Sequence, residues 1–272
     1  MLNVQPDYDY AAQAKELRKT VPDPSHARST FDEDFRLRAK DGKTVALLLR
    51  NVIPERLHHR AFDSWWERVT HRVTDRTDVL GTRSLPKTMC RDRSPSGFYG
   101  VNKGILDATP AGEARQTTLG CSAHGITPIT KKYPQMLNDN RELIELVDQL
   151  FKKRLPHVRE KACTEIKKAP EEFRLWWTAF SSIYLLKNWA SRYHRDKNNL
   201  RGVLTALIAV GNFKGGALVL PRWAFAIAFK PGDVLFFNPQ EIHGNLPFSG
   251  RRISAAFYCA RHVAHAGNRR AV

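Results

Sequence analysis

Between residues 203 and 237 the sequence alternates short apolar runs with turn residues, and this pattern restricts the fold more than any other feature. The runs have the length and composition of short strands: Val203–Val210, Ala217–Leu220, Ala224–Phe229 and Asp233–Phe237. Gly215-Gly216 and Pro231-Gly232 lie between them, and Pro followed by Gly suits the centre of a type II turn. Short strands at such intervals predict a jelly-roll barrel, that is, a double-stranded β-helix.

Possible metal ligands flank this stretch. His194 and Asp196 precede it, and His243 follows it. Because residues i and i+2 of a strand project to the same face, His194 and Asp196 can reach one metal ion. A second imidazole from a neighbouring strand would complete a two-His, one-carboxylate facial triad, which is typical of iron(II) oxygenases. A single His-x-Asp pair is common by chance, so this interpretation depends on the predicted strands.

A candidate anion site follows the second histidine. The guanidinium fork of Arg252 can pair with the far carboxylate of 2-oxoglutarate. Ser254 lies on the same strand face and adds a hydroxyl. We therefore predict His194, Asp196 and His243 as metal ligands and catalytic residues, and Arg252 and Ser254 as the residues that bind the co-substrate.

The segment from Ile183 to Ala260 resembles the TET/JBP family of 2-oxoglutarate oxygenases, which hydroxylate the methyl group of 5-methylcytosine or thymine in DNA. Several motifs carry the resemblance: HRDKNN at 194–199, GGALVLP at 215–221, PGDVLFF at 231–237 and RISAAFY at 252–258. Related prolyl-hydroxylase-type enzymes share a version of the second and third motifs, whereas the last is closer to TET. The N-terminal half carries no such resemblance.

The resemblance implies iron(II), 2-oxoglutarate and dioxygen as cofactors, with ascorbate as a stimulant, and DNA with a flipped methylated base as the partner. It also implies that Asn199 contacts the target base and that Tyr258 stacks on it. In TET, a His two residues after this Tyr helps to hold the cytosine, whereas this chain has Ala260. We expect conversion of 5-methylcytosine to 5-hydroxymethylcytosine first, with thymine to 5-hydroxymethyluracil as a close rival.

The charge of the chain also points to a nucleic acid. With 44 Lys and Arg against 27 Asp and Glu, the formal charge is +17, which attracts a polyanion. A generically basic protein would show the same excess. The stretch Arg91–Lys103 mixes basic residues with Phe98 and Tyr99, which suits either a nucleic-acid contact or an ordinary surface loop.

Two other functions stay open from the sequence. One is a 2-oxoglutarate oxygenase that acts as a nucleic-acid N-methyl demethylase or as a protein hydroxylase. The other is a cupin-like nucleic-acid binder without enzymatic activity. Asn199 and Tyr258 favour the DNA base hydroxylase over the first alternative, and the triad with Arg252 disfavours the second.

We predict one α+β domain over residues 1–272, with a jelly-roll core at 173–262 and mainly helical and loop support, carrying substrate-binding surface, at 1–172. The expected N-terminal elements are helices at Tyr10–Lys19, Pro54–Val73 and Asn140–Lys153, a strand at Thr44–Arg50, and loops over Gly81–Thr117. The first residues lack the features of a secretion signal, and no apolar run approaches the roughly 20 residues that span a bilayer. We therefore expect an intracellular monomer, nuclear or in nucleoid-associated cytoplasm, without membrane contact.

Overall fold

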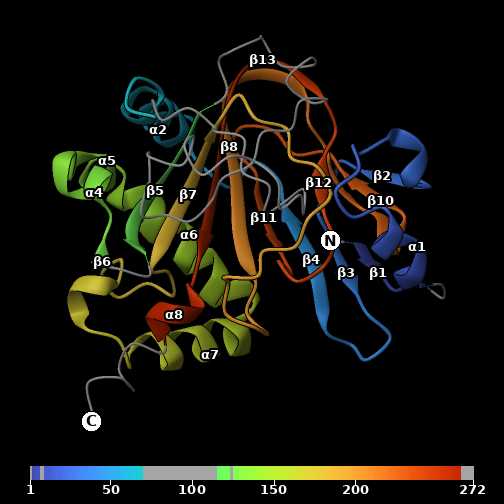
Figure 1. Cartoon of the computed structure of the whole chain (residues 1–272), viewed down its shortest axis with the longest axis horizontal. Helices are drawn as coiled ribbons and strands as arrows, with labels where there is room; N and C mark the ends of the chain where they lie inside the picture. The colour runs from blue at the N-terminus through green and yellow to red at the C-terminus, as the bar shows by residue number, and fades with distance from the viewer. Residues whose placement is uncertain (1, 7–8, 70–114, 123–124, 265–272) are drawn as a thin grey trace, which may run out of the picture.

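The computed structural model describes residues 2–6, 9–69, 115–122 and 125–264, and it shows a mixed α/β fold with two β-sheets (Figure 1). The larger sheet has nine strands in the order β1-β3-β4-β11-β8-β13-β7-β5-β6, and the smaller has four in the order β12-β9-β10-β2. The strands are β1 (Leu2–Val4), β2 (Ser29–Phe31), β3 (Phe35–Arg38), β4 (Thr44–Leu49), β5 (Arg115–Ser122), β6 (Gly125–Ile126), β7 (Ser182–Lys187), β8 (Thr205–Gly215), β9 (Leu218–Leu220), β10 (Phe225–Ile227), β11 (Val234–Phe237), β12 (Gly244–Asn245) and β13 (Phe248–Tyr258).

Helices come mainly from the N-terminal part of the described chain. They are α1 (Ala11–Glu16), α2 (Glu55–Trp66), α4 (Pro128–Lys132), α5 (Gln135–Asn138), α6 (Arg141–Arg154), α7 (Pro156–Ile166) and α8 (Arg261–Ala264), with short 3-10 turns η1 (Pro24–His26), η3 (Glu171–Phe173) and η4 (Pro221–Trp223). In Figure 1, α2, α6 and α7 lie on one side of the large sheet, while β2 and β10 lie on the other.

Alternate residues of the central strands face two different layers. Ile253, Ala255 and Phe257 of β13 belong to a buried cluster with residues of α2, α6 and α7. Intervening positions, such as Leu207 of β8 and Leu235 of β11, pack instead against the small sheet. This period of two means that every second residue of β13, including Arg252 and Ser254, faces the space between the sheets. Arg252 and Ser254 therefore lie on the inner face of the large sheet.

Several predicted elements are confirmed. The four short runs between residues 203 and 237 correspond to β8 to β11, and Gly232 has a φ of +95°, as position three of a type II turn requires. Helices α1, α2 and α6 and strand β4 match the predicted ranges in place, although α2 ends at Trp66, before the expected Val73.

The described part of the N-terminal half supplies more strands than the sequence predicted. Besides the expected β4, it contains β1, β2, β3, β5 and β6. Phe35–Arg38 pairs with β4, which in turn pairs with β11 of the C-terminal half, so the two halves share one sheet. The expected loop also ends too late, since residues 115–117 already belong to β5, which pairs with β7. Pairing of these strands satisfies backbone N–H and C=O groups that would otherwise be unpaired at the edges of the C-terminal strands.

Candidate functional site

A pair of backbone hydrogen bonds brings the two predicted histidine ligands together. His194 N donates to His243 O over 2.9 Å, and His243 N donates to His194 O over 3.0 Å. This is an isolated antiparallel bridge, so the expectation that His194 and Asp196 lie on a regular strand is wrong. The segment is held from outside, because Asp196 N also donates to Pro239 O over 2.9 Å. His194 and Asp196 are thus held in place by backbone hydrogen bonds to the segment around His243, and not by a regular strand.

Both imidazoles are oriented by the same local contact. Nδ1 of His194 lies 2.7 Å from Arg192 O, and Nδ1 of His243 lies 2.9 Å from Glu241 O. With Nδ1–H donated to a carbonyl, the lone pair of each neutral ring is on Nε2. The two Nε2 atoms lie 3.4 Å and 3.9 Å from the Asp196 carboxylate oxygens. One ligand atom from each of the three residues lies within 4.8 Å of the others, an arrangement that can hold a metal ion.

The three groups have interdependent protonation. Burial lowers the pKa of His243 to about 4, and the neighbouring His194 acts in the same direction. Burial also disfavours a charged His194, but its hydrogen bond and charge interaction with Asp196 outweigh burial and raise the His194 pKa. The Asp196 pKa is lowered, because its contacts with the two histidines outweigh burial. In the absence of metal, His194 therefore takes up a proton at a higher pH than His243 does.

Arg252 is a buried cation in an aromatic cage. Its side chain is almost fully buried, and its guanidinium carbon lies 5.0–5.1 Å from the ring centres of Phe213, Phe229 and Phe248. Nη1 donates to Gly216 O over 3.2 Å, whereas Nε has no hydrogen-bond partner. Burial lowers the Arg252 pKa to about 9. No carboxylate pairs with it among the described residues, so this guanidinium fits an incoming carboxylate such as that of 2-oxoglutarate.

The other predicted site residues are buried near these groups. Ser254, on the inner face of β13, is 5% exposed. Asn199 N donates to Asp196 O over 3.3 Å, and Asn199 Nδ2 donates to Thr205 Oγ1 over 2.9 Å. Tyr258 is 8% exposed and packs with Ala260 in a small apolar cluster, so its ring does not stand open to solvent.

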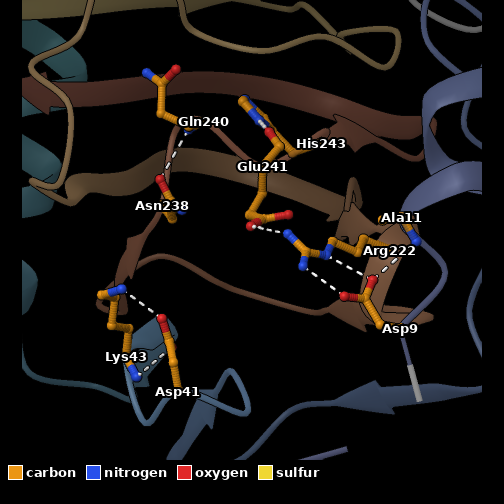
Figure 2. A network of polar contacts seen from close by, with 9 residues as sticks. All are labelled: Asp9, Ala11, Asp41, Lys43, Arg222, Asn238, Gln240, Glu241 and His243. Carbon is orange, nitrogen blue, oxygen red and sulfur yellow. Dashed lines mark hydrogen bonds and ion pairs between the residues drawn. The ribbon is translucent and has the colours of Figure 1, made fainter.

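The sequence did not reveal every residue of the site. Tyr184 of β7 packs against the Tyr258 cluster, and burial raises its pKa, with Tyr258 and Asp196 acting in the same direction. Glu241, which orients His243 through its carbonyl, forms an ion pair with Arg222, which also binds Asp9 (Figure 2). Neither Tyr184 nor Arg222 lies in a quoted motif, so only the three-dimensional contacts could identify them.

Two expectations concern other parts of the molecule. The suggested nucleic-acid contact at Arg91–Lys103 lies outside the described residues. Among the residues that are described, no helix combines the length and the apolar character needed to cross a membrane.

Comparisons with known proteins agree with this geometry. Residues 114–261, more than half of the chain, match the Tet_JBP family model, described as an oxygenase domain of the 2OGFeDO superfamily. Among curated proteins, the bifunctional helicase and thymine dioxygenase JBP2 of Trypanosoma brucei brucei is 39% identical over 123 residues, which cover 43% of this chain and 11% of JBP2. JBP2 of Leishmania infantum is 31% identical over 114 residues, which cover 40% of this chain and 10% of that protein. The chain thus spans about a tenth of these relatives.

A solved structure shares the fold. The structure of NgTET1 in complex with 5mC DNA superposes with a TM-score of 0.58 at 15% identity, covering 96% of this chain and 83% of that one. At this identity the likeness concerns the fold alone. With 96% of this chain covered, the likeness extends into the N-terminal half, for which no motif suggested a relative.

Proposed function

The chain belongs to the Tet_JBP family of oxygenase domains in the 2OGFeDO superfamily, and on this premise we propose that it hydroxylates the 5-methyl group of a pyrimidine base in DNA. It is an iron(II)- and 2-oxoglutarate-dependent dioxygenase. The observation that carries the proposal is the pairing of two separate sites. One is the cluster of His194, Asp196 and His243, and the other is the caged Arg252 cation.

Each side chain has a definite part in this proposal. His194, Asp196 and His243 would hold iron(II) through two Nε2 atoms and a carboxylate, and Arg252 with Ser254 would bind the distal carboxylate of 2-oxoglutarate. Bound iron and 2-oxoglutarate supply the oxidising chemistry, in which a methyl group, 2-oxoglutarate and dioxygen give a hydroxymethyl group, succinate and carbon dioxide. The protein positions the reactants and excludes water. The cage of partly buried Phe213 and buried Phe229 and Phe248 serves the second purpose around Arg252.

The base must leave the helix to reach such a buried site. Flipping costs a few kcal/mol, which stacking and hydrogen bonds in the pocket recover in part. Asn199 and Tyr258 are the proposed base contacts, and Tyr184 is added to them because it packs beside Tyr258. Since the Tyr258 ring is covered in this structure, stacking requires a local rearrangement of its cluster. The +17 charge supports DNA as the partner.

We rank thymine above 5-methylcytosine as the target base, which reverses the order inferred from the motifs. The Trypanosoma relative named a thymine dioxygenase is 39% identical over the matched segment. Ala260, in place of the His that holds cytosine in TET, is fully buried and brings no polar side-chain atom. Asn199 does not discriminate, because its amide can present either a donor or an acceptor. The TET-like Asn199 and Tyr258 keep 5-methylcytosine as the second candidate.

The overall organisation completes the proposal. We infer that the inner faces of the two sheets form a double-stranded β-helix around the site, and that residues 1–272 act as one domain. We further propose that the protein works as an intracellular monomer on DNA. Strands β1, β3 and β4 join the large sheet and β2 joins the small sheet, so both sheets combine strands from the two halves, which supports a single unit.

One experiment tests the reaction. The protein is incubated with iron(II), 2-oxoglutarate, ascorbate and oxygen, with unmethylated, 5-methylcytosine-containing or N-methylated DNA, and nucleosides are measured by mass spectrometry. We expect 5-hydroxymethyluracil from all DNA that contains thymine, and none with Asp196→Ala. Formation of 5-hydroxymethylcytosine alone would select the second candidate base. Formaldehyde release from N-methylated DNA without either product would contradict base hydroxylation and favour demethylation.

A further inference from the structure

Arg222 joins three segments that are far apart in the sequence. It lies in η4, between β9 and β10 of the small sheet. Its Nη2 and Nε bind the two carboxylate oxygens of Asp9 over 2.6 Å and 2.8 Å, and its Nη1 lies 3.2 Å from Glu241 Oε1. The guanidinium also stacks on the neighbouring Trp223 ring at 4.8 Å. These contacts fix the guanidinium plane between the N-terminal segment and the turn that precedes His243 (Figure 2).

Glu241 connects Arg222 with the metal cluster. The Glu241 side chain is 10% exposed, and Arg222 is the cation that pairs with it. The carbonyl of the same residue accepts the hydrogen bond from His243 Nδ1 over 2.9 Å. Arg222 is the ion-pair partner of this carboxylate, with the charge of Arg195 as a further favourable interaction. Loss of Arg222 would leave the buried charge poorly compensated and drive the Glu241 side chain towards water. The carbonyl that orients the His243 ring would then move with it.

The N-terminal segment makes a second contact of this kind. Lys19 N donates to Tyr193 O over 2.8 Å, and Tyr193 N donates to Thr20 O over 3.1 Å. Tyr193 is the residue before His194, and its hydroxyl lies 3.0 Å from His26 Nδ1. Residues 9–26 therefore touch the supports of both histidines, one through Arg222 and the other through Tyr193.

We propose that Arg222 is a positioning residue for the metal ligand His243, and that the N-terminal segment at Asp9 holds Arg222 in place for this purpose. The proposal rests on the metal site assigned under the proposed function. Arg222 does not touch the metal ligands itself; it acts through the Glu241 carboxylate and carbonyl. Partners that orient a metal-bound histidine in this way change metal affinity by about 10- to 100-fold when they are removed.

The test measures metal affinity rather than turnover. The metal-free chain of 272 residues is titrated with Co(II), and binding is followed by visible absorption. We expect Arg222→Ala to raise the Co(II) Kd by about 10- to 100-fold, and Arg222→Lys, which keeps the charge but not the fork, to raise it less. Asp9→Asn should have the smallest effect, because Asp9 contacts only Arg222 in this chain of interactions.

A matched variant separates positioning from general stability. Arg159 binds the buried Asp148 over 2.6 Å in the helical layer, away from the metal cluster, so Arg159→Ala removes a comparable ion pair. Arg159→Ala should bind Co(II) as the wild type does. Unchanged Co(II) affinity in folded Arg222→Ala and Arg222→Lys, or equal weakening in Arg159→Ala, would overturn the proposal. Failure of the wild type to bind Co(II) would instead overturn the metal site, and with it the proposed function.

Discussion

At the scale of single residues, the proposed recognition of the co-substrate depends on the cage around Arg252. Arg252→Lys keeps a positive charge but loses the planar fork and the stacking on three phenylalanine rings. We expect the apparent KM for 2-oxoglutarate to rise at least about tenfold, since a lost charged hydrogen bond is worth about 1.5–3 kcal/mol, with DNA affinity little changed. Arg251→Lys, at the exposed neighbouring position, is the control. A raised KM in Arg251→Lys together with an unchanged KM in Arg252→Lys would place the anion site on Arg251.

The pKa of His243 leads to a prediction about stability in the absence of metal. Burial lowers the pKa of His243 in the folded state to about 4. Between about pH 6.5 and 4, His243 is therefore mostly protonated in the unfolded state and mostly neutral in the folded state. Stability should therefore be complete above pH 6.5 and be lost as the pH falls through this window. The loss attributable to one proton is about 1.4 kcal/mol per pH unit.

Urea unfolding of chelator-treated protein between pH 7 and 4 measures this loss. His243→Gln cannot take up the proton, so its stability should fall less steeply with decreasing pH. Parallel curves for the wild type and His243→Gln would show that His243 is not the source. His194 contributes with the opposite sign, because Asp196 raises its folded-state pKa, and this contribution is common to both proteins.

At the scale of elements, the turn between β8 and β9 shapes the proposed anion site. Gly216 has a φ of +76°, and a Cβ there would overlap with Arg252 Nη1. Gly216→Ala should therefore lower stability through backbone strain, by about 1–2 kcal/mol, and also displace the Arg252 guanidinium. Gly42 has a similar φ of +79°, but a Cβ added at this position would have no neighbouring atom within 4 Å, so Gly42→Ala carries the strain alone.

Binding of 2-oxoglutarate distinguishes these two variants. By calorimetry, we expect weaker 2-oxoglutarate binding in Gly216→Ala and unchanged binding in Gly42→Ala, although both unfold at a lower urea concentration. Equal binding in the two variants would mean that the Arg252 side chain adapts without loss. The turn would then be needed only for the connection between β8 and β9.

The elements also show which parts of the structure the sequence could predict. Strands β8 to β11 were recognisable because apolar runs and turn residues alternate over this stretch. β3 was missed because Phe35–Arg38 is only four residues long and its pairing with β4 and, beyond it, β11 is not local. The candidate metal ligands follow from a spacing pattern in the sequence. The Phe213, Phe229 and Phe248 cage and the Asp9–Arg222–Glu241 contacts join segments that no local pattern relates.

At the scale of the whole molecule, the two sheets and the N-terminal segment converge on one site. The large sheet supplies Arg252 and Ser254, the bridge joins the two histidines of the candidate metal cluster, and the N-terminal segment supports both histidines. Residues 9–26 and the C-terminal core are therefore structurally interdependent. A shortened chain that keeps only the segment resembling TET/JBP would lack strands β1 to β4 of the two sheets and the Asp9 contact with Arg222.

The net charge makes the last prediction, which concerns the whole surface. A chain with a formal charge of +17 should bind DNA largely by releasing counterions from phosphates. On a plot of log affinity against log salt concentration, we expect a straight line whose slope is about −0.9 for each phosphate contacted in duplex DNA. Fluorescence anisotropy with a labelled duplex between about 50 and 200 mM salt measures this slope, with about 10³-fold weakening for six contacts.

Variants then separate the charge from the pocket. A substitution in the base pocket, such as Asn199→Ala, should reduce base oxidation and leave the slope unchanged, because Asn199 is buried and carries no charge. Reversal of an exposed basic residue that contacts DNA, in contrast, should reduce the slope by about one contact. A flat salt dependence in the wild type would contradict a polyanionic substrate. It would favour a protein hydroxylase over the proposed DNA hydroxylase, even with the iron and 2-oxoglutarate sites intact.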